Sequence, residues 1–297
     1  MFMSFKKYIV SLLLTLSMFF SLSGHAKSPV FKVSKGDDYV YIGGTIHLLS
    51  PSDYPLPIGF DKAFNNAQKI FFEVNSDDFN TLETQTKSAK VMMFQDERTL
   101  KSELNEDTYN RLSKFLEERQ LPIAVFSKFT PAGVSITLTI FELQRLGLGN
   151  PGSGVDHFFQ LKTRQSDSKS DSYLETIDEQ IRFLDSFNQV DANTLIQSSL
   201  EDLDVLQVNW KNVLTAWRNG EMLKMSNLLG ADQMKAQFPL IYKTLLIDRN
   251  ERWLKQITPM FETPEVELIL VGALHLVGEG GLIELLQAQG YAVEQLD

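Results

Sequence analysis

Two stretches of the sequence, "YIGGTIHLLS" at Tyr41–Ser50 and "LVGALHLVGE" at Leu270–Glu279, repeat one pattern more than 200 residues apart. Each runs from apolar, partly β-branched residues into a glycine, then two further residues, and then His-Leu. Such apolar runs are typical of buried strands, and ligands of an open α/β sheet bind where strands end. We therefore expect His47 and His275 to project from two strand ends into one crevice. In the alternative interpretation, each histidine only forms a hydrogen bond within its own loop.

Strands and helices alternate at both ends of the sequence, and the middle is largely helical. Strands are expected within residues 30–44, 69–74, 171–175, 266–272 and 291–296, and helices at 57–68, 105–119, 131–149, 155–165, 281–290 and across most of 192–261. The predicted fold class is therefore α/β (or α+β). It has a central mixed sheet flanked by helices, with a largely helical insertion in the middle, in a single domain at residues 27–297.

Residues 1–26 have the pattern of a signal peptide. Lys6 and Lys7 precede an apolar stretch of about 15 residues, which is shorter than the roughly 20 that span a bilayer. Gly24-His25-Ala26 then fits a cleavage site between small residues. We expect a mature chain that begins near Lys27, is periplasmic or secreted, and has no stable membrane insertion. The alternative is a retained N-terminal anchor.

Composition narrows the classes of partner and of chemistry. Loss of two lysines with the signal changes the net charge from −10 to −12, which disfavours nucleic acid and anionic membrane surfaces as partners. The chain has no cysteine, which excludes disulfides, thiolate metal sites and a cysteine nucleophile. It also contains no H-E-x-x-H and no G-x-S-x-G, so a zincin helix and a serine-hydrolase elbow are not expected.

Four further charged residues lie where they could join the two histidines. Glu73 ends the apolar run "KIFFE", Asp156 follows the loop "GSGV", Glu175 ends "YLE", and Arg249 lies in the helical segment "LLIDRNERW". Glu73 and Glu175 could instead be capping or surface carboxylates. Arg249 could instead form an ordinary ion pair with a neighbour on its helix.

The same residues resemble those of a known family. The matching pieces, in chain order, are "GTIHLL", "FFE", "GVD", "LET" followed by Gln180, "RN" followed by Trp253, and "VGALHLVGEGGLIELLQAQGY". Over Val40 to Val293 the sequence resembles the TraB/GumN family, which is related to the Tiki proteases and more remotely to erythromycin esterases and the haem-binding ChaN proteins. One departure is "KSDSY", which is less apolar than the strand that usually precedes "LET" and leaves the setting of Glu175 open.

The resemblance implies an EreA/ChaN-like sheet flanked by helices and a metal-dependent site, because Tiki-type members are proteases that favour manganese or cobalt. It marks His47, Glu73, Arg249 and His275, and less closely Asp156 and Glu175. Two imidazoles with carboxylates also offer a mixed nitrogen and oxygen shell that suits Mn, Co or Zn. We expect His47, His275, Glu73 and Asp156 to be the ligands of a divalent metal.

These expectations combine into a predicted activity. A metal with an open position would activate water for hydrolysis with Glu73 as base, Arg249 would hold a substrate carboxylate or the oxyanion, and Glu175 would be a further catalytic carboxylate. The prediction is a metal-dependent hydrolase, in the first place a peptidase acting on a peptide or protein. The alternative is a non-catalytic periplasmic protein that binds a peptide or haem in the same crevice. The sequence assigns no role to His157 and no oligomeric state.

Overall fold

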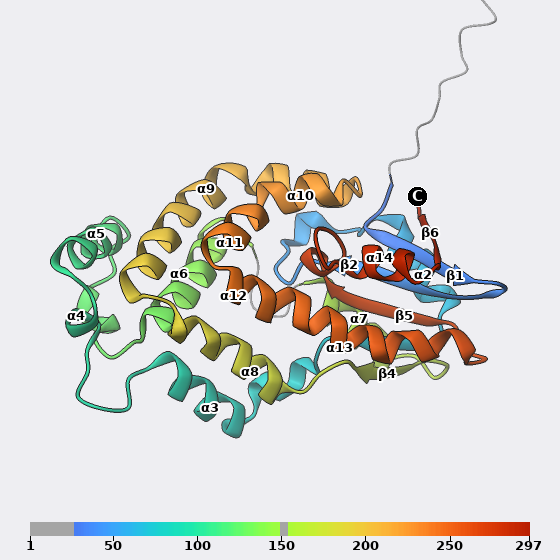
Figure 1. Cartoon of the computed structure of the whole chain (residues 1–297), viewed down its shortest axis with the longest axis horizontal. Coiled ribbons are helices and arrows are strands. Elements are labelled where there is room, and N and C mark those ends of the chain that lie inside the picture. Colours follow the sequence, from blue (N-terminus) through green and yellow to red (C-terminus); the bar gives the residue numbers. More distant parts are fainter. Residues whose placement is uncertain (1–26, 149–153) are drawn as a thin grey trace, which may run out of the picture.

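The computed structural model describes residues 27–148 and 154–297. The expected signal peptide, residues 1–26, lies outside the described residues. The described chain has a sheet with helices packed around it and a mainly helical region beside the sheet, as Figure 1 shows. This arrangement confirms the predicted α/β fold with a helical insertion.

The sheet has six strands in the order β4-β3-β5-β2-β1-β6. Their bounds are β1 Val30–Lys35, β2 Asp38–Thr45, β3 Lys69–Phe72, β4 Ser170–Tyr173, β5 Glu267–Gly272 and β6 Ala292–Gln295. Strands β4, β3, β5 and β2 pair in parallel, whereas β1 is antiparallel to both of its neighbours. The sheet is therefore mixed, and β2 and β5, the strands of the two repeated stretches, lie side by side.

Helices cover both faces of the sheet, as expected from the continuous apolar run in β5. The residues from Glu267 to Val271 are all buried, which is typical of a parallel strand covered on both faces. The covering elements are α2 (Ile58–Asn66), α7 (Val155–Arg164), the end of α9 (Ala192–Arg218), α13 (Asp248–Ile257), η6 (Thr258–Glu262) and α14 (Leu282–Ala288). The ring of Phe60 packs between those of Phe159 and Trp217 within this core, in tilted pairs.

The helical insertion has a second apolar core of its own, formed by buried residues such as Leu112, Leu116, Leu138 and Ile196. These residues come from α5, α6 and α9, which lie together on the side away from the sheet in Figure 1. The remaining helical elements are η1 (Pro51–Asp53), η2 (Ser76–Asn80), α3 (Leu82–Met92), α4 (Leu100–Glu103), α5 (Glu106–Glu117), η3 (Ile123–Phe126), α6 (Pro131–Arg145), α8 (Ile177–Ser186), η4 (Phe187–Gln189), α10 (Met222–Leu228), α11 (Ala231–Gln237), α12 (Pro239–Tyr242), η5 (Lys243–Ile247) and η7 (Ala273–His275).

The polar strand β4 lies at an edge of the sheet, and this position explains its composition. Its residues "SDSY" are half-buried or exposed, because only β3 pairs with it. Polar residues are common on edge strands, where one side faces water. The chain returns to the interior directly afterwards, since Leu174 and Glu175 are buried.

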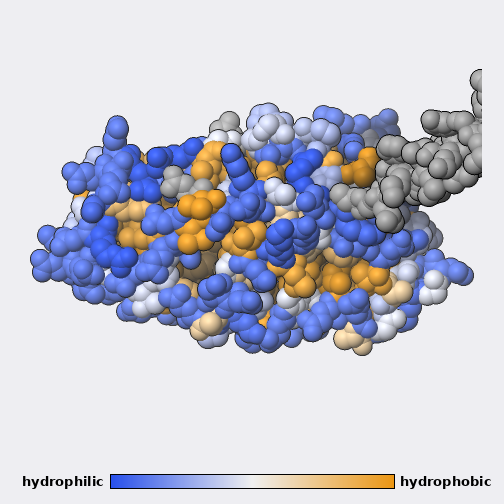
Figure 2. Space-filling model, turned by 90° about the horizontal axis from the view of Figure 1, so that it is seen from above, coloured by the Kyte–Doolittle hydropathy of each residue, from blue (hydrophilic) through white to orange (hydrophobic). Residues whose placement is uncertain are grey.

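The surface is mainly hydrophilic, in keeping with the acidic composition. Figure 2 shows the face that carries α9 and α10, where apolar side chains gather in patches along the middle. Val208 of α9 and Leu223 of α10 are among the exposed apolar residues. Across residues 27–148 and 154–297, none of the helices combines the length and the hydropathy that a bilayer-spanning segment needs.

Candidate functional site

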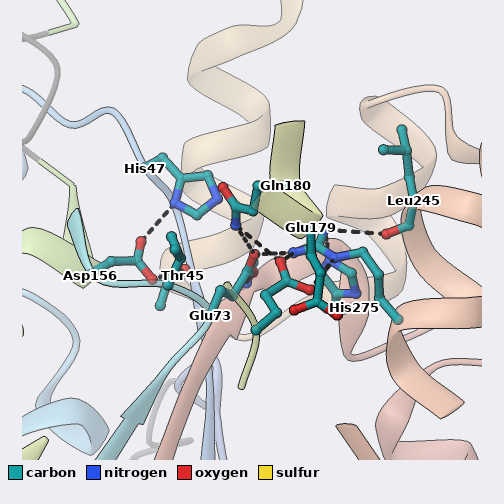
Figure 3. A network of polar contacts seen from close by, with 12 residues as sticks. Thr45, His47, Glu73, Asp156, Glu179, Gln180, Leu245 and His275 are labelled. Carbon is teal, nitrogen blue, oxygen red and sulfur yellow. Dashed lines mark hydrogen bonds and ion pairs between the residues drawn. The ribbon is translucent and has the colours of Figure 1, made fainter. Parts of the chain in front are cut away.

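The carboxyl ends of the four parallel strands meet at one edge of the sheet, and each leads to a residue singled out from the sequence. His47 follows β2, Glu73 follows β3, Glu175 follows β4 and His275 follows β5. Figure 3 shows His47, Glu73 and His275 close to one another in a network of polar contacts. Parallel strands with ligand-binding groups at this edge are the general pattern of open α/β sheets.

Gly272 of the second G-x-x-H motif marks the point at which these groups converge. A Cβ atom placed on Gly272 would lie 3.2 Å from Glu73 Oε1, 3.6 Å from His47 Nε2 and 3.6 Å from His275 Cδ2. The structure thus brings both histidines and Glu73 around one small position. A glycine leaves that position open, whereas a side chain would fill it.

His47 is paired with Asp156 at the start of α7. The Nδ1 atom of His47 lies 2.7 Å from Asp156 Oδ2, and the hydroxyl of Thr45 donates to Asp156 Oδ1 at 2.9 Å. The backbone holds the pair together, because Val155 N–H donates to the carbonyl of Ile46 at 3.0 Å. Asp156 is therefore oriented toward the histidine ring, and the ring's Nε2 atom is left for the cavity.

Gly154 is needed for this close approach of α7. A Cβ atom there would come within 2.3 Å of the backbone carbonyl of His47, closer than any real contact. Steric contact with His47 therefore explains why the last residue of the "GSG" loop is a glycine. Asp156 also lies in the first turn of α7, where a helix favours negative charge.

The pair carries a proton at neutral pH. The negative charge of Asp156 raises the pKa of His47 to about 9, although the protein that surrounds the ring in the cavity wall acts in the opposite direction. The His47 side chain is 63 % exposed, because the ring forms part of a cavity wall. Its Nε2 atom therefore bears a hydrogen that it can donate to a molecule in the cavity.

Glu73 is an ionised carboxylate held by three donors. Its Oε1 accepts from the backbone N–H of Gly272 at 2.6 Å, and its Oε2 accepts from Arg249 and, at 3.4 Å, from Gln180. Burial would raise the pKa of Glu73, but the neighbouring positive charge of Arg249 and the Gly272 hydrogen bond outweigh it and hold the pKa at about 2.

Arg249 is buried, which excludes an ordinary surface ion pair. Its guanidinium contacts Glu73, donates to both oxygens of Glu175 at 2.6 and 3.2 Å, and donates to the carbonyl of Leu245 at 3.3 Å. Its charged centre lies 4.6 Å from the Trp253 ring. The π-helical turn Lys243–Ile247 precedes it, and such turns often occur at functional sites. Arg249 is absent from the cavity lining, and its predicted contact with substrate stays a prediction.

Glu175 lies behind Glu73 and continues the same network. Its backbone N–H donates to the carbonyl of Glu73 at 3.0 Å, and the side-chain amide of Gln180 donates to its Oε1 at 3.1 Å. The residue is buried, and burial raises the pKa of its carboxyl despite the nearby guanidinium of Arg249. Its setting, which the sequence left open, is therefore the interior side of the site.

His275 is a neutral, fully oriented ring. The side-chain nitrogen of Asn250 donates to two carbonyl groups, so the Asn250 oxygen faces His275 Nδ1 at 2.7 Å and accepts its hydrogen. His275 Nε2 then carries a lone pair, and Arg249 donates to it at 3.0 Å. Burial lowers the pKa of His275 to about 3, so the ring stays uncharged. Asn250, Gln180 and Thr45 had no predicted role in the sequence, although all three lie within the matching motifs.

A cavity of about 450 Å³ opens beside the polar groups. Its polar wall includes His47, Glu73, Asp156, His157 and Gln180. Its apolar wall is formed by Leu48, Phe72, Val74, Phe79 and Ile140, so it lies between the sheet edge and the helical insertion. A mostly apolar cleft with a few converging polar groups is the usual form of a small-molecule or substrate site.

The arrangement differs from the metal site expected from the sequence. Asp156 is engaged by Thr45 and His47, and the lone pair of His275 Nε2 faces Arg249. Among the described residues, no group of three or more acidic or histidine side chains is arranged to hold a metal ion. In this arrangement the residues do not fit a metal bound by both histidines, and the metal stays a prediction.

Comparisons with known proteins identify the family of the chain. The model of the TraB/PrgY/gumN family matches residues 29–295. Uncharacterized protein YbaP of Escherichia coli (strain K12) is 26% identical over 262 residues, which cover 85% of this chain and 89% of YbaP, and YbaP of Shigella flexneri gives the same figures. No solved structure matches the chain. Because the family model covers nearly all of the described residues, the chain belongs to the TraB/PrgY/gumN family.

Proposed function

We propose that this protein is a hydrolase that cleaves peptides in the cavity, with His47 and Glu73 as the groups that move protons. The observation that supports it best is that His47 Nε2 and Glu73 Oε1 lie close together beside Gly272, in the wall of the cavity. At neutral pH one of these groups is a protonated imidazole and the other an ionised carboxylate. An acid and a base side by side in one cavity are what general acid–base catalysis requires.

In the proposed reaction, Glu73 Oε1 accepts a proton from a water molecule whose oxygen forms a bond to the peptide carbonyl carbon. His47 donates its Nε2 hydrogen to the amide nitrogen, and the C–N bond breaks to give a carboxylic acid and an amine. The proton on Glu73 then returns to His47 through solvent. Asp156 fixes the ring, as a carboxylate does in other histidine pairs. A carboxylate with a pKa of about 2 is a weak base, so His47 and the fixed position of the water make the larger contributions.

The cavity suggests the class of peptide. Phe79 and Ile140 are 44% and 40% exposed and line the cavity from different elements. An apolar side chain of the substrate would bury this surface, which favours binding by about 25 cal/mol for each Å² removed from water. We infer cleavage next to a large apolar residue.

The metal and the location remain separate parts of the proposal. A divalent Mn, Co or Zn ion would have His47 Nε2 and Glu73 Oε1 as its nearest donors in the cavity wall, and no step above depends on it. A periplasmic or secreted location rests on the signal-like residues 1–26. The apolar cavity is equally suited to a protein that binds a peptide or haem without turnover.

A peptide-library assay separates these possibilities. The purified protein is incubated with the library in EDTA and with added Mn, Co or Zn, and products are identified by mass spectrometry. The expected result is cleavage beside apolar residues that is lost in His47→Ala and kept in His157→Ala, a matched histidine of the same cavity wall. Cleavage with metal but not with EDTA would support the metal. Tight binding without cleavage under every condition would favour the binding protein.

A further inference from the structure

Arg249 lies at the centre of three groups that are all suited to bind a metal. Its guanidinium donates to His275 Nε2 at 3.0 Å and to the two oxygens of Glu175 at 2.6 and 3.2 Å, and it contacts Glu73 Oε2. One imidazole and two carboxylates, all directed at one point, form a donor set that Mn, Co and Zn accept. The point itself is occupied by the guanidinium.

The donors cannot easily turn elsewhere, because the whole cluster is buried. Arg249, Glu73, Glu175 and His275 are each at most 8% exposed. His275 is fixed by Asn250 so that its lone pair faces the guanidinium. A single lone pair cannot accept a hydrogen bond from Arg249 and bind a metal at the same time.

The guanidinium also provides the charge that a metal would bring. Two carboxylates face it in the interior, where water screens their charges poorly. A divalent ion placed beside it would meet a like charge at short range, which is strongly unfavourable. The space and the charge balance of the cluster therefore both exclude a metal while Arg249 stays in place.

We propose that Arg249 is a resident cation that fills the metal position between Glu73, Glu175 and His275, so that this position binds no divalent metal in the native protein. Removal of the guanidinium converts the cluster into a divalent-metal site with one imidazole and two carboxylate ligands. The inference does not depend on whether the protein is a hydrolase. It places any native metal outside this cluster.

The test is a titration with Co²⁺, in which binding is measured by calorimetry and by the visible absorbance of the bound ion. Arg249→Ala should bind one equivalent of Co²⁺ at least roughly 100-fold more tightly than the native protein does at this position, because both the space and the repelling charge have gone. The same variant should be stabilised against heat by Co²⁺. Adding His275→Ala should remove both effects. Arg252→Ala, on the same helix but with a side chain 40% exposed, is the matched control and should gain no site.

The native protein gives a second test that does not require the variant to fold. Co²⁺ binding to the native protein that is unchanged in His275→Ala would place the ion elsewhere and support the proposal. One tightly bound Co²⁺ in the native protein that disappears in His275→Ala would overturn it. Arg249→Ala that folds but binds no more Co²⁺ than the control would also overturn it.

Discussion

Replacement of Arg249 by methionine removes a buried positive charge and keeps a side chain of similar length. Glu73 and Glu175 would then face each other without the guanidinium that now bonds to both. Removing one partner of a buried ion pair costs about 3–5 kcal/mol, and two carboxylates lose their partner here. We expect Arg249→Met to lose about 4–5 kcal/mol of unfolding free energy at neutral pH, a large part of the typical 5–15 kcal/mol.

The pH dependence of the loss identifies its cause. In the native protein the pKa of Glu73 is lowered from 4.5 to about 2, a shift worth about 3 kcal/mol. This contribution is complete above pH 4.5 and is lost as the pH falls through about 2. The lowered pKa of His275 also makes the native protein lose unfolding free energy as the pH falls, in this case between pH 6.5 and about 3. Without Arg249, burial raises the pKa of Glu73 above its ordinary value, so the variant gains stability relative to the native protein as the pH falls.

The measurement is urea unfolding, followed by tryptophan fluorescence, at several pH values between 4 and 8. The control is Arg252→Met on the same helix, whose side chain is 40% exposed and lies 3.9 Å from Glu175. It should lose less than about 1 kcal/mol. The reasoning would be refuted if Arg249→Met lost no more than this control, or if the difference from the native protein did not shrink as the pH falls.

Four further predictions concern the proposed activity and the chain start. His47→Ala should lower cleavage by about 10²–10⁴-fold with unchanged circular dichroism, as expected for loss of a general acid, and equal activity in both proteins would contradict it. The native rate should fall as the pH rises through about 9, where His47 loses its proton, and Asp156→Asn should move this fall to lower pH; a pH profile that the substitution leaves unchanged would exclude His47 as the acid. Ile140→Asp should raise KM for apolar peptides by about tenfold or more, because a charge replaces apolar surface in the cavity, with peptides lacking a large apolar residue as the control. N-terminal sequencing of the exported protein should begin near Lys27, whereas intact residues 1–26 in a membrane fraction would reject cleavage.

The sheet-edge position of the site could be predicted from the sequence because the information is local. The glycine and histidine of each repeated stretch follow an apolar run, so strand ends and site residues are marked together. Glu73 is marked in the same way by the run "KIFFE". The periodicity and composition of a segment indicate whether its residues are buried. Continuous apolar runs therefore identify the inner strands of the sheet.

The partners of these residues could not be predicted, because they depend on how distant helices meet at the edge. Asn250 of α13 orients His275, and Gln180 of α8 bridges Glu73 and Glu175. Arg249 could equally have been a surface residue, since a helical sequence of mixed charge does not state which side faces the sheet. The predicted metal set assumed that two histidines converge with their lone pairs, which the contact between Arg249 and His275 prevents in this arrangement.

The strand order has a consequence for how the chain folds. Strand β5 lies between β3 and β2. These two strands come early in the chain, and neither can pair with β5 until residues 267–272 have been synthesised. Pairing β2 with β5 closes a loop of more than 200 residues, and contacts of such long sequence separation form slowly. A chain that ends before β5 therefore exposes two unpaired apolar strand edges, which favour aggregation. Truncations of the last 30 or so residues should accordingly be insoluble, rather than folded and inactive.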